Sequence, residues 1–253
     1  MMQSFRTLVS PAYRASQSAR ILATAESIDR RSGLGVGRVI PDADDMAIHE
    51  GRSLHAAVLF LDISGFTSRP QETMEQQELM LRGLSLFFTE AIRVVEDFGG
   101  TVEKNTGDGL MAYFVAEPNE GATKEQRAVA AALTLFHVVN DALNSTLNNA
   151  LIARGIPPFL FRICIDSGPL TIAKMGAALR FNGIVAIGTT ANLACKMLNV
   201  AKAGELMIGN NVREGLPSEW KGLSTVSDHD TGYSYSLTGA PYQYWYYYGR
   251  WTS

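Results

Sequence analysis

The chain has 253 residues, of which 46% are hydrophobic and 19% charged, and its formal net charge is −3. This composition is typical of a globular protein with a buried core, and the absence of a long basic run argues against a nucleic-acid partner. No stretch reaches the roughly 18 apolar residues that a membrane-spanning helix needs. The N-terminus also lacks the apolar segment of a secretory signal. We therefore expect a soluble, cytoplasmic protein with no membrane partner.

The N-terminal region differs from the rest of the chain. Ser10 is suited to cap a helix, Pro11 to occupy its first turn and Gly33 to end it, and four arginines make its surface basic. Both a docking helix and an arm that binds a partner or locks a dimer fit this pattern. A Gly-rich connection, "GLGVGRVIPDADD", follows. We predict a helical arm and linker over residues 1–52 and the main domain over residues 53–253.

From residue 55 onward the pattern alternates between strands and helices. The predicted elements, in chain order, are a strand at 55–63, a helix at 72–98, a hairpin of "TVEKN" and "LMAYFV", a helix at 124–147, strands "FRICIDSG" and "GIVAIG", a helix at 189–201, a strand "GELMIG" and a terminal pair, "SYSLTG" with "YQYWYYY". The order β-α-β-β-α-β predicts an α+β fold with a ferredoxin-like core. The two cysteines, Cys164 and Cys195, lie in apolar segments, and we expect both to be small buried core residues.

Two aspartates lie at the ends of predicted strands, where they could bind a metal ion. Asp62 follows the apolar run "AAVLFL", and Asp108 lies in the "TGDG" turn of the hairpin. If the two strands are neighbours, the carboxylates converge, and a pair of carboxylates requires a cation such as a hard divalent ion. The alternative is that Asp108 only favours the turn. Since Asp62 also lies at a strand end, we favour the metal site.

The residues after Asp62, "ISGFT", lead from the strand toward the next helix. Backbone N–H groups at a helix entrance attract phosphate, and Gly65 permits a close approach. A metal-binding carboxylate beside such a turn suits a nucleoside triphosphate with its metal ions. Further along, Asn192 and Lys196 stand four residues apart on a predicted helix and project from one face, either as an ordinary polar surface or as ligands of a sugar and a phosphoryl group.

Together these segments resemble the class III nucleotidyl cyclases, the adenylyl/guanylyl cyclase catalytic domain. The resemblance is carried by "FLDISGFT", "GGTVEKNTGDGLMAYF", "FRICIDSGPL" and "IGTTANLACKMLNVAKAGELMI", in the order of the family, over roughly residues 55–210. It implies a homodimer with active sites across the interface and makes residues 53–253 the catalytic domain. It also implies two divalent cations, Mn²⁺ or Mg²⁺, as cofactors.

The resemblance assigns a role to each candidate residue. Asp62, the Ile63 carbonyl and Asp108 would bind the metals, and Gly65, Phe66 and Thr67 would contact the triphosphate. Asn192 would orient the ribose from the partner protomer. Lys196 stands where the family normally carries an arginine that stabilises the transition state, and lysine lacks the bidentate fork.

The positions that choose the base depart from the adenylyl cyclases. Lys104 matches their base-selecting lysine, but its usual companion, an aspartate or threonine, falls on Val185, which cannot accept a hydrogen bond from an adenine amino group. With the basic N-terminal arm, this departure resembles the pyrimidine (uridylate or cytidylate) cyclases of bacterial antiphage defence, whose cyclic product activates a separate effector protein. Lys104 could donate to uracil or to cytosine, and we slightly prefer UTP.

Two other readings stay open. An adenylate cyclase with a relaxed base pocket would keep the chemistry and change the substrate. A non-catalytic, cyclase-like module would bind nucleotide without turning it over. Since degenerate members of the family typically lose a metal carboxylate and this chain keeps both, we favour an enzyme.

Overall fold

The computed structural model describes residues 34–36, 46–105, 107–116, 121–140, 146–175 and 184–250. The predicted N-terminal helix lies outside these residues. Within them, no helix is both long and apolar enough to cross a bilayer. The main strand, β2, begins at Gly51 and ends at Ile63.

The core of the molecule is an antiparallel sheet with the ferredoxin-like order of strands, as the sequence predicts. Its elements are β2 (Gly51–Ile63), α3 (Met74–Asp97), β3 (Gly100–Asn105), β4 (Gly109–Val115), α4 (Lys124–Asn140) and β5 (Phe161–Lys174). The strands lie in the order β3-β4-β2-β5, and each neighbouring pair is antiparallel. The central position of β2 places its C-terminal end, with Asp62, between β4 and β5.

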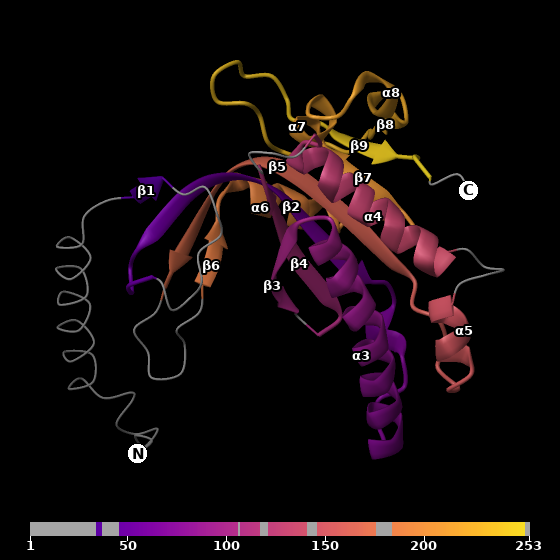
Figure 1. The fold of residues 1–253 in the computed structure, drawn as a ribbon. Helices are drawn as coiled ribbons and strands as arrows, with labels where there is room; N and C mark the ends of the chain where they lie inside the picture. The colour runs from indigo at the N-terminus through magenta and orange to yellow at the C-terminus, as the bar shows by residue number, and fades with distance from the viewer. Residues whose placement is uncertain are drawn as a thin grey trace, which may run out of the picture.

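Further elements surround this core, and some of them extend the sheet beyond β5 (Figure 1). They are β1 (Leu34–Val36), η2 (Phe66–Ser68), α5 (Thr146–Ile152), β6 (Ile184–Ile187), α6 (Thr189–Met197), β7 (Leu206–Gly209), α7 (Asn210–Glu214), α8 (Ser218–Lys221), β8 (Ser224–Val226) and β9 (Tyr244–Tyr247). The sheet continues from β5 through β7 and β9 to β8, while β6 pairs with β5 and β1 with β2. The result is a nine-stranded sheet.

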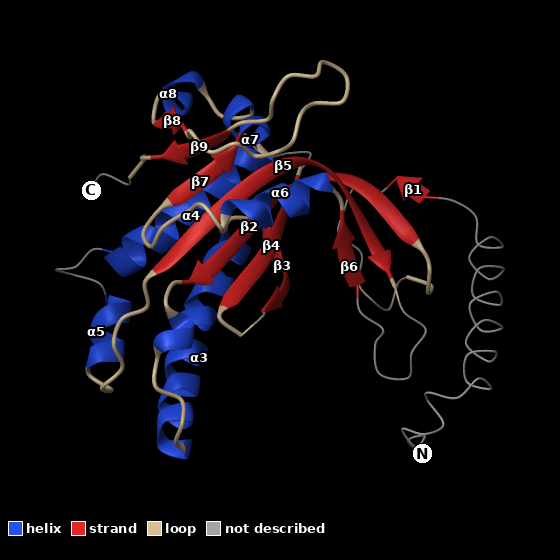
Figure 2. Ribbon diagram, turned by 180° about the vertical axis from the view of Figure 1, so that it is seen from behind, coloured by secondary structure: helices blue, strands red, loops and turns tan. Residues whose placement is uncertain are grey.

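Side chains of β2 alternate between two hydrophobic cores, as expected for a strand covered on both faces. Leu59 and Leu61 belong to the core under α3 and α4, whereas Val58 belongs to the core under α6 and the C-terminal tyrosines. Figure 1 shows α3 and α4 on one face of the sheet, and Figure 2, from behind, shows α6 on the other. By this alternation Asp62 lies on the α6 face.

The predicted helix at 72–98 is observed as α3, with both ends explained by local chemistry. A capping box starts it, because the Thr73 hydroxyl accepts from the Gln76 N–H while the Gln76 side chain accepts from the Thr73 N–H. Gly99 follows the C-cap with φ of 71°, a left-handed conformation that suits glycine. The Gly99–Gly100 stop is therefore confirmed.

Three expectations are wrong. The helix predicted at 124–147 is two helices, α4 and α5, with residues between them that are not described. "SYSLTG" is not a strand, because β9 already pairs with β7 on one side and β8 on the other. Cys164 is buried as expected, but Cys195 is exposed, beside Lys196 on the outer face of α6.

Candidate functional site

The structure brings the backbones of Asp62 and Asp108 together. Asp62 pairs with Gly109 in the β2–β4 ladder, so Asp108 is the residue just before its partner. The Ile63 N–H donates to the Asp108 carbonyl over 2.9 Å. Both aspartates are half-buried. The two acids therefore lie at the same end of adjacent antiparallel strands, as the sequence analysis required.

The partner of the Asp62 side chain is an arginine that the sequence analysis did not single out. Arg162 lies opposite Asp62 in the β2–β5 ladder. Its Nε donates to Asp62 Oδ2 over 2.9 Å, and a terminal nitrogen lies 2.7 Å from the same oxygen. The other terminal nitrogen donates to the Ala201 carbonyl. Arg162 thus compensates the carboxylate and engages one of its two oxygens.

The donor chemistry at this strand end fits a hard divalent cation. Asp62 and Asp108 offer carboxylate oxygens, the ligands that Mg²⁺ and Mn²⁺ prefer. The neighbouring Ser64 Oγ is buried and makes no hydrogen bond within the described residues. The described chain holds no group of three or more His, Cys, Asp or Glu side chains placed to share an ion. Two acids alone suit an ion whose remaining ligands come from water and substrate phosphates.

The turn after β2 is exposed and left-handed. Gly65 has φ of 67° and caps the short 3₁₀ helix η2 at its N-terminal side. The Ser68 hydroxyl donates to the Gly65 carbonyl over 2.7 Å, which holds the turn closed. Phe66 packs against the core under α3, while Gly65 and Thr67 face solvent. The turn is accessible to a ligand, although α3 itself begins only at Met74.

Helix α6 carries the other pair of candidates on the sheet face that also holds Asp62. Asn192 and Lys196 are exposed, whereas Leu193, Ala194 and Met197 are buried against the sheet. The helix starts after Gly188 and is preceded by β6. The prediction that the two polar side chains project from one exposed face is confirmed.

The two base-selecting candidates lie on different strands of the same sheet. Lys104 pairs through its backbone with Met111 in the β3–β4 ladder, after a bulge at Val102/Lys104. Val185 pairs with Ala173 in the β5–β6 ladder and is half-buried. Three strands, β4, β2 and β5, separate β3 from β6 along the sheet path. Within one chain, the described backbone therefore does not bring these two positions together as sheet neighbours.

A second polar cluster was missed by the sequence analysis. Asp166 on β5 is 1% exposed, and the Tyr242 hydroxyl donates to it. Burial raises the pKa of Asp166 to about 7, and the Tyr242 bond opposes that rise. The signal was present in "FRICIDSG", since Arg162, Cys164 and Asp166 alternate along one face of a strand.

A buried glutamate on α4 reaches the same strand. Glu125 accepts from the Ser167 hydroxyl over 2.6 Å and pairs with Lys124 over 2.7 Å. Burial acts to raise the pKa of Glu125, but the bonds from Lys124 and Ser167 outweigh it, so that the pKa is lowered. The pair anchors the start of α4 to β5 and belongs to the scaffold rather than to the strand end with Asp62.

Known proteins resemble this chain in both sequence and fold. It is 29% identical over 173 residues to an uncharacterized protein of Mycobacterium tuberculosis, covering 68% of this chain and 29% of that protein. The chain thus spans less than a third of the length of that relative. It is 26% identical over 199 residues to a uridylate cyclase of Burkholderia cepacia, covering 72% of this chain and 82% of the cyclase.

Solved structures give the same picture. The guanylyl cyclase Cya2 matches with a TM-score of 0.63 at 20% identity, covering 79% of this chain and 95% of that one. The adenylyl cyclase CyaB from Pseudomonas aeruginosa matches with a TM-score of 0.61 at 24% identity, covering 80% and 97%. A family model described as the adenylate and guanylate cyclase catalytic domain matches residues 48–235. That match spans most of the chain, which therefore belongs to the adenylate and guanylate cyclase catalytic-domain family.

Proposed function

We propose that this protein is a metal-dependent nucleotide cyclase that converts a pyrimidine nucleoside triphosphate, UTP in preference to CTP, into its 3′,5′-cyclic monophosphate and pyrophosphate. The observation that carries the proposal is the placement of Asp62 and Asp108 at the same end of adjacent strands, within the region that matches the cyclase family.

In the proposed reaction the ribose 3′ oxygen forms a bond to the α-phosphorus. The bond from that phosphorus to the bridging oxygen of pyrophosphate breaks, and the hydroxyl proton passes to solvent. Divalent ions held by Asp62, Asp108 and the Ile63 carbonyl would supply charge neutralisation for the phosphates. The exposed turn at Gly65, Phe66 and Thr67 would receive the triphosphate on backbone N–H groups.

A homodimer completes the site in this proposal. One copy supplies the acids of β2 and the β3–β4 turn, and the other supplies α6 with its exposed Asn192 and Lys196. Asn192 would hold the ribose in place, and the Lys196 ammonium would stabilise negative charge on the reacting phosphoryl group. Lys104 and Val185 are not sheet neighbours within one chain. This does not contradict a shared site, because in the homodimer each residue would face groups from both copies.

Two observations support a pyrimidine base. Val185 stands where the adenylyl cyclases carry a polar side chain, so the adenine amino group would find no acceptor there. One relative, similar over most of its own length, is a uridylate cyclase. Lys104 would donate to the base carbonyl. A role in antiphage defence, with the cyclic product read by a separate effector protein, extends the same proposal.

The test is a parallel incubation of the protein with ATP, GTP, CTP and UTP, each with Mn²⁺ and with Mg²⁺, and separation of the products by chromatography and mass. We expect cyclic UMP above cyclic CMP, and no cyclic product from the Asp108→Ala variant. If cyclic AMP were the only product, the protein would be an adenylate cyclase with a relaxed base pocket, and the pyrimidine assignment would be wrong. Turnover that survives in both Asp62→Asn and Asp108→Ala would refute the two-metal site.

A second candidate is a nucleotide-binding module without turnover. Two observations favour it. First, Arg162 forms an ion pair with the Asp62 carboxylate. Second, a class III adenylyl cyclase-like ATP-binding protein from Pseudomonas aeruginosa matches this fold with a TM-score of 0.62 at 18% identity, covering 85% of this chain and 45% of that one. Calorimetric binding of metal and nucleotide, without release of pyrophosphate from any of the four substrates, would establish this candidate.

A further inference from the structure

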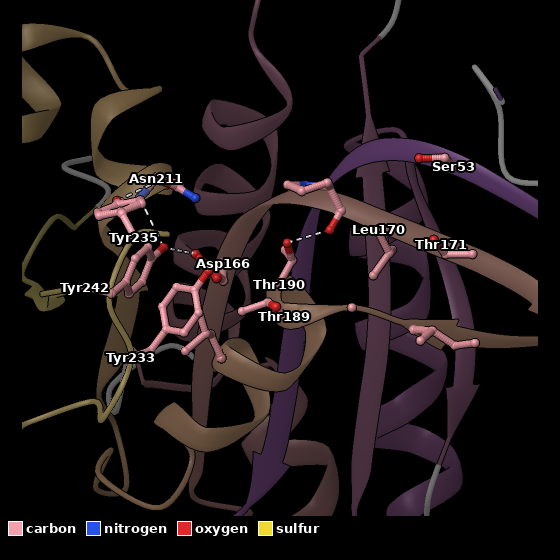
Figure 3. Close-up of a pocket in the computed structure, with 14 residues that line it drawn as sticks. Ser53, Asp166, Leu170, Thr171, Thr189, Thr190, Asn211, Tyr233, Tyr235 and Tyr242 are labelled. Atoms are coloured by element: carbon pink, nitrogen blue, oxygen red, sulfur yellow. Dashed lines mark hydrogen bonds between the residues drawn. The ribbon is translucent and has the colours of Figure 1, made fainter. Parts of the chain in front are cut away.

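A cavity of about 430 Å³ lies on the α6 face of the sheet, apart from the strand end that carries Asp62. Figure 3 shows its walls, which come from β2, β5, the end of β6, the start of α6, α7 and the C-terminal segment that follows β8. Asp62 and Asp166 point to the same face of the sheet, and four residues of strand place Asp166 about 13 Å beyond Arg162. The volume is within the range of small-molecule pockets.

Asp166 supplies the one formal charge among the fourteen described residues that line the cavity. Its neighbours hold it rigidly, since the Tyr242 hydroxyl donates to Oδ1 and the backbone of Gly209 packs so close that a Cβ there would overlap the carboxylate. In the described residues no Lys, Arg or His forms an ion pair with it. A buried carboxylate without a cationic partner is energetically costly.

Tyrosine rings surround this end of the cavity. The Tyr242 ring lies 5.8 Å from the Tyr233 ring and 5.2 Å from the Tyr235 ring, centroid to centroid. The faces of such rings carry negative potential and attract cations. The remaining lining combines the apolar side chains of Leu170 and Leu193 with hydroxyl-bearing residues, namely Ser53, Thr171, Thr189 and Thr190. The cavity thus combines one carboxylate, an aromatic cluster, an apolar wall and several hydroxyl groups.

The polar groups of this cluster are set before any ligand arrives. The Tyr235 hydroxyl donates to Asn211 Oδ1 over 3.0 Å and accepts from Asn210 Nδ2 over 3.0 Å. The Asn211 amide in turn donates to the Ser167 carbonyl over 2.8 Å. These bonds hold the aromatic wall against β5. A pre-organised wall lowers the cost of ordering on binding.

We propose that this cavity is a binding site for a small organic monocation, a protonated amine whose ammonium group lies beside Asp166 and whose carbon body lies against the tyrosines and the apolar wall. A neutral molecule of the same shape would bury the carboxylate without compensating its charge. An anion would be repelled by it. The site is distinct from the nucleotide site and does not depend on the proposed function.

Two probes of the same skeleton test the proposal: phenethylammonium, which is charged, and 2-phenylethanol, which is not. Dissociation constants are measured by ligand-observed NMR on the full chain at pH 8, because burial raises the pKa of Asp166 to about 7 and the carboxylate is ionised above that value. We expect phenethylammonium to bind at least about tenfold more tightly than the alcohol. Equal affinity for the two probes, or no binding of either, would overturn the proposal.

Two variants locate the binding. Asp166→Asn keeps an oxygen that can accept from Tyr242, and we expect it to remove the preference for the charged probe. Tyr233→Leu removes a ring whose hydroxyl makes no hydrogen bond to the described residues, and we expect a loss of about two- to tenfold in affinity for phenethylammonium. Thermal unfolding checks that each variant is folded. If Asp166→Asn does not fold, the proposal is still tested by Tyr233→Leu and by the two probes on the wild type. An unchanged preference in a folded Asp166→Asn would also refute the site.

Discussion

At the scale of single residues, Arg162 changes how the candidate metal site must be understood. The Asp62 carboxylate is compensated within the described chain by two nitrogens of this guanidinium, both on Oδ2. The two side chains are 30% and 22% exposed, so solvent screens the pair and its contribution to stability is modest. Its larger effect is on a cation that approaches Asp62, because Arg162 places a like charge beside it.

The first prediction is therefore that Arg162→Gln binds Mn²⁺ more tightly than the wild type when no nucleotide is present. Removal of one positive charge beside the proposed metal position should increase the affinity by about tenfold, which is about 1.4 kcal/mol. Electron paramagnetic resonance of free Mn²⁺ measures the change. Arg162→Lys keeps the charge and serves as the control. Weaker binding in Arg162→Gln would show instead that the arginine positions Asp62 for the metal.

The second prediction concerns the pH dependence of stability at Asp166. Burial raises its pKa from the ordinary value of 3.8 to about 7, so between these values the folded state keeps a proton that the unfolded state has lost. Stability from this group is complete at low pH and decreases between about pH 4 and pH 7. At about 1.4 kcal/mol per pKa unit, the loss is on the order of 4 kcal/mol.

Asp166→Asn cannot ionise and removes this dependence. As the pH rises from 4.5 to 7.5, we expect the free energy of unfolding of the wild type to fall relative to that of Asp166→Asn. Urea unfolding followed by circular dichroism at several pH values gives both curves. Two curves that run parallel would mean that Asp166 does not retain its proton in the folded state.

At the scale of elements, the turn from α3 to β3 depends on an arginine from α4. Arg127 donates to the carbonyls of Phe98, Gly99 and Val115, and so joins the end of α3 to the sheet. Gly99 has φ of 71°, and a Cβ at this position would overlap the Arg127 guanidinium. The glycine is required here both for its conformation and for its lack of a side chain.

The third prediction is that Gly99→Ala destabilises the protein by about 3 kcal/mol, as the sum of left-handed strain and weakened charged hydrogen bonds. Gly232→Ala is a matched control, because Gly232 has φ of 63° and no atom within 4 Å of the added Cβ. It should lose only about 1 kcal/mol. Chemical unfolding gives the loss of stability in each variant. The difference between the two losses measures the effect of the overlap with Arg127, because the left-handed backbone strain is common to both. Equal losses in the two variants would remove the role assigned to Arg127.

At the scale of the whole molecule, the fold was predictable where local pattern and topology agree. The helix α3 was predictable from its apolar spacing and its glycine stop, and the β3–β4 hairpin from its turn residues. The convergence of Asp62 with Asp108 required only that their strands be neighbours. Each of these depends on residues close in sequence or on one strand pairing.

The features that could not be predicted depend on long-range register. The Asp62–Arg162 pair joins residues 100 positions apart and exists because of the β2–β5 register. The Asp166–Tyr242 bond spans 76 positions and needs the C-terminal segment folded back on β5. The choice of β8 rather than "SYSLTG" as the partner of β9 is of the same kind. Hydrophobic periodicity carries no information about such pairings.

The fourth prediction tests whether the proposed site is shared between two copies. Asp62 lies on the sheet face that α6 also covers, but the roles proposed for Asp108 and Asn192 require them to come from different copies. A variant with Asp108→Ala and a variant with Asn192→Ala should each be inactive alone. When they are mixed and allowed to exchange, about half of the dimers are hybrids, and one of the two sites in each hybrid is intact.

The mixture should thus recover about a quarter of the wild-type activity. The control is the same mixing with a double variant, Asp108→Ala with Asn192→Ala, in place of either partner, which leaves no intact site in a hybrid with a single variant. Sedimentation confirms that the copies associate. If the mixture stays inactive while hybrids form, both residues act within one copy. The site would then be completed by α6 of the same chain rather than by α6 of a second copy.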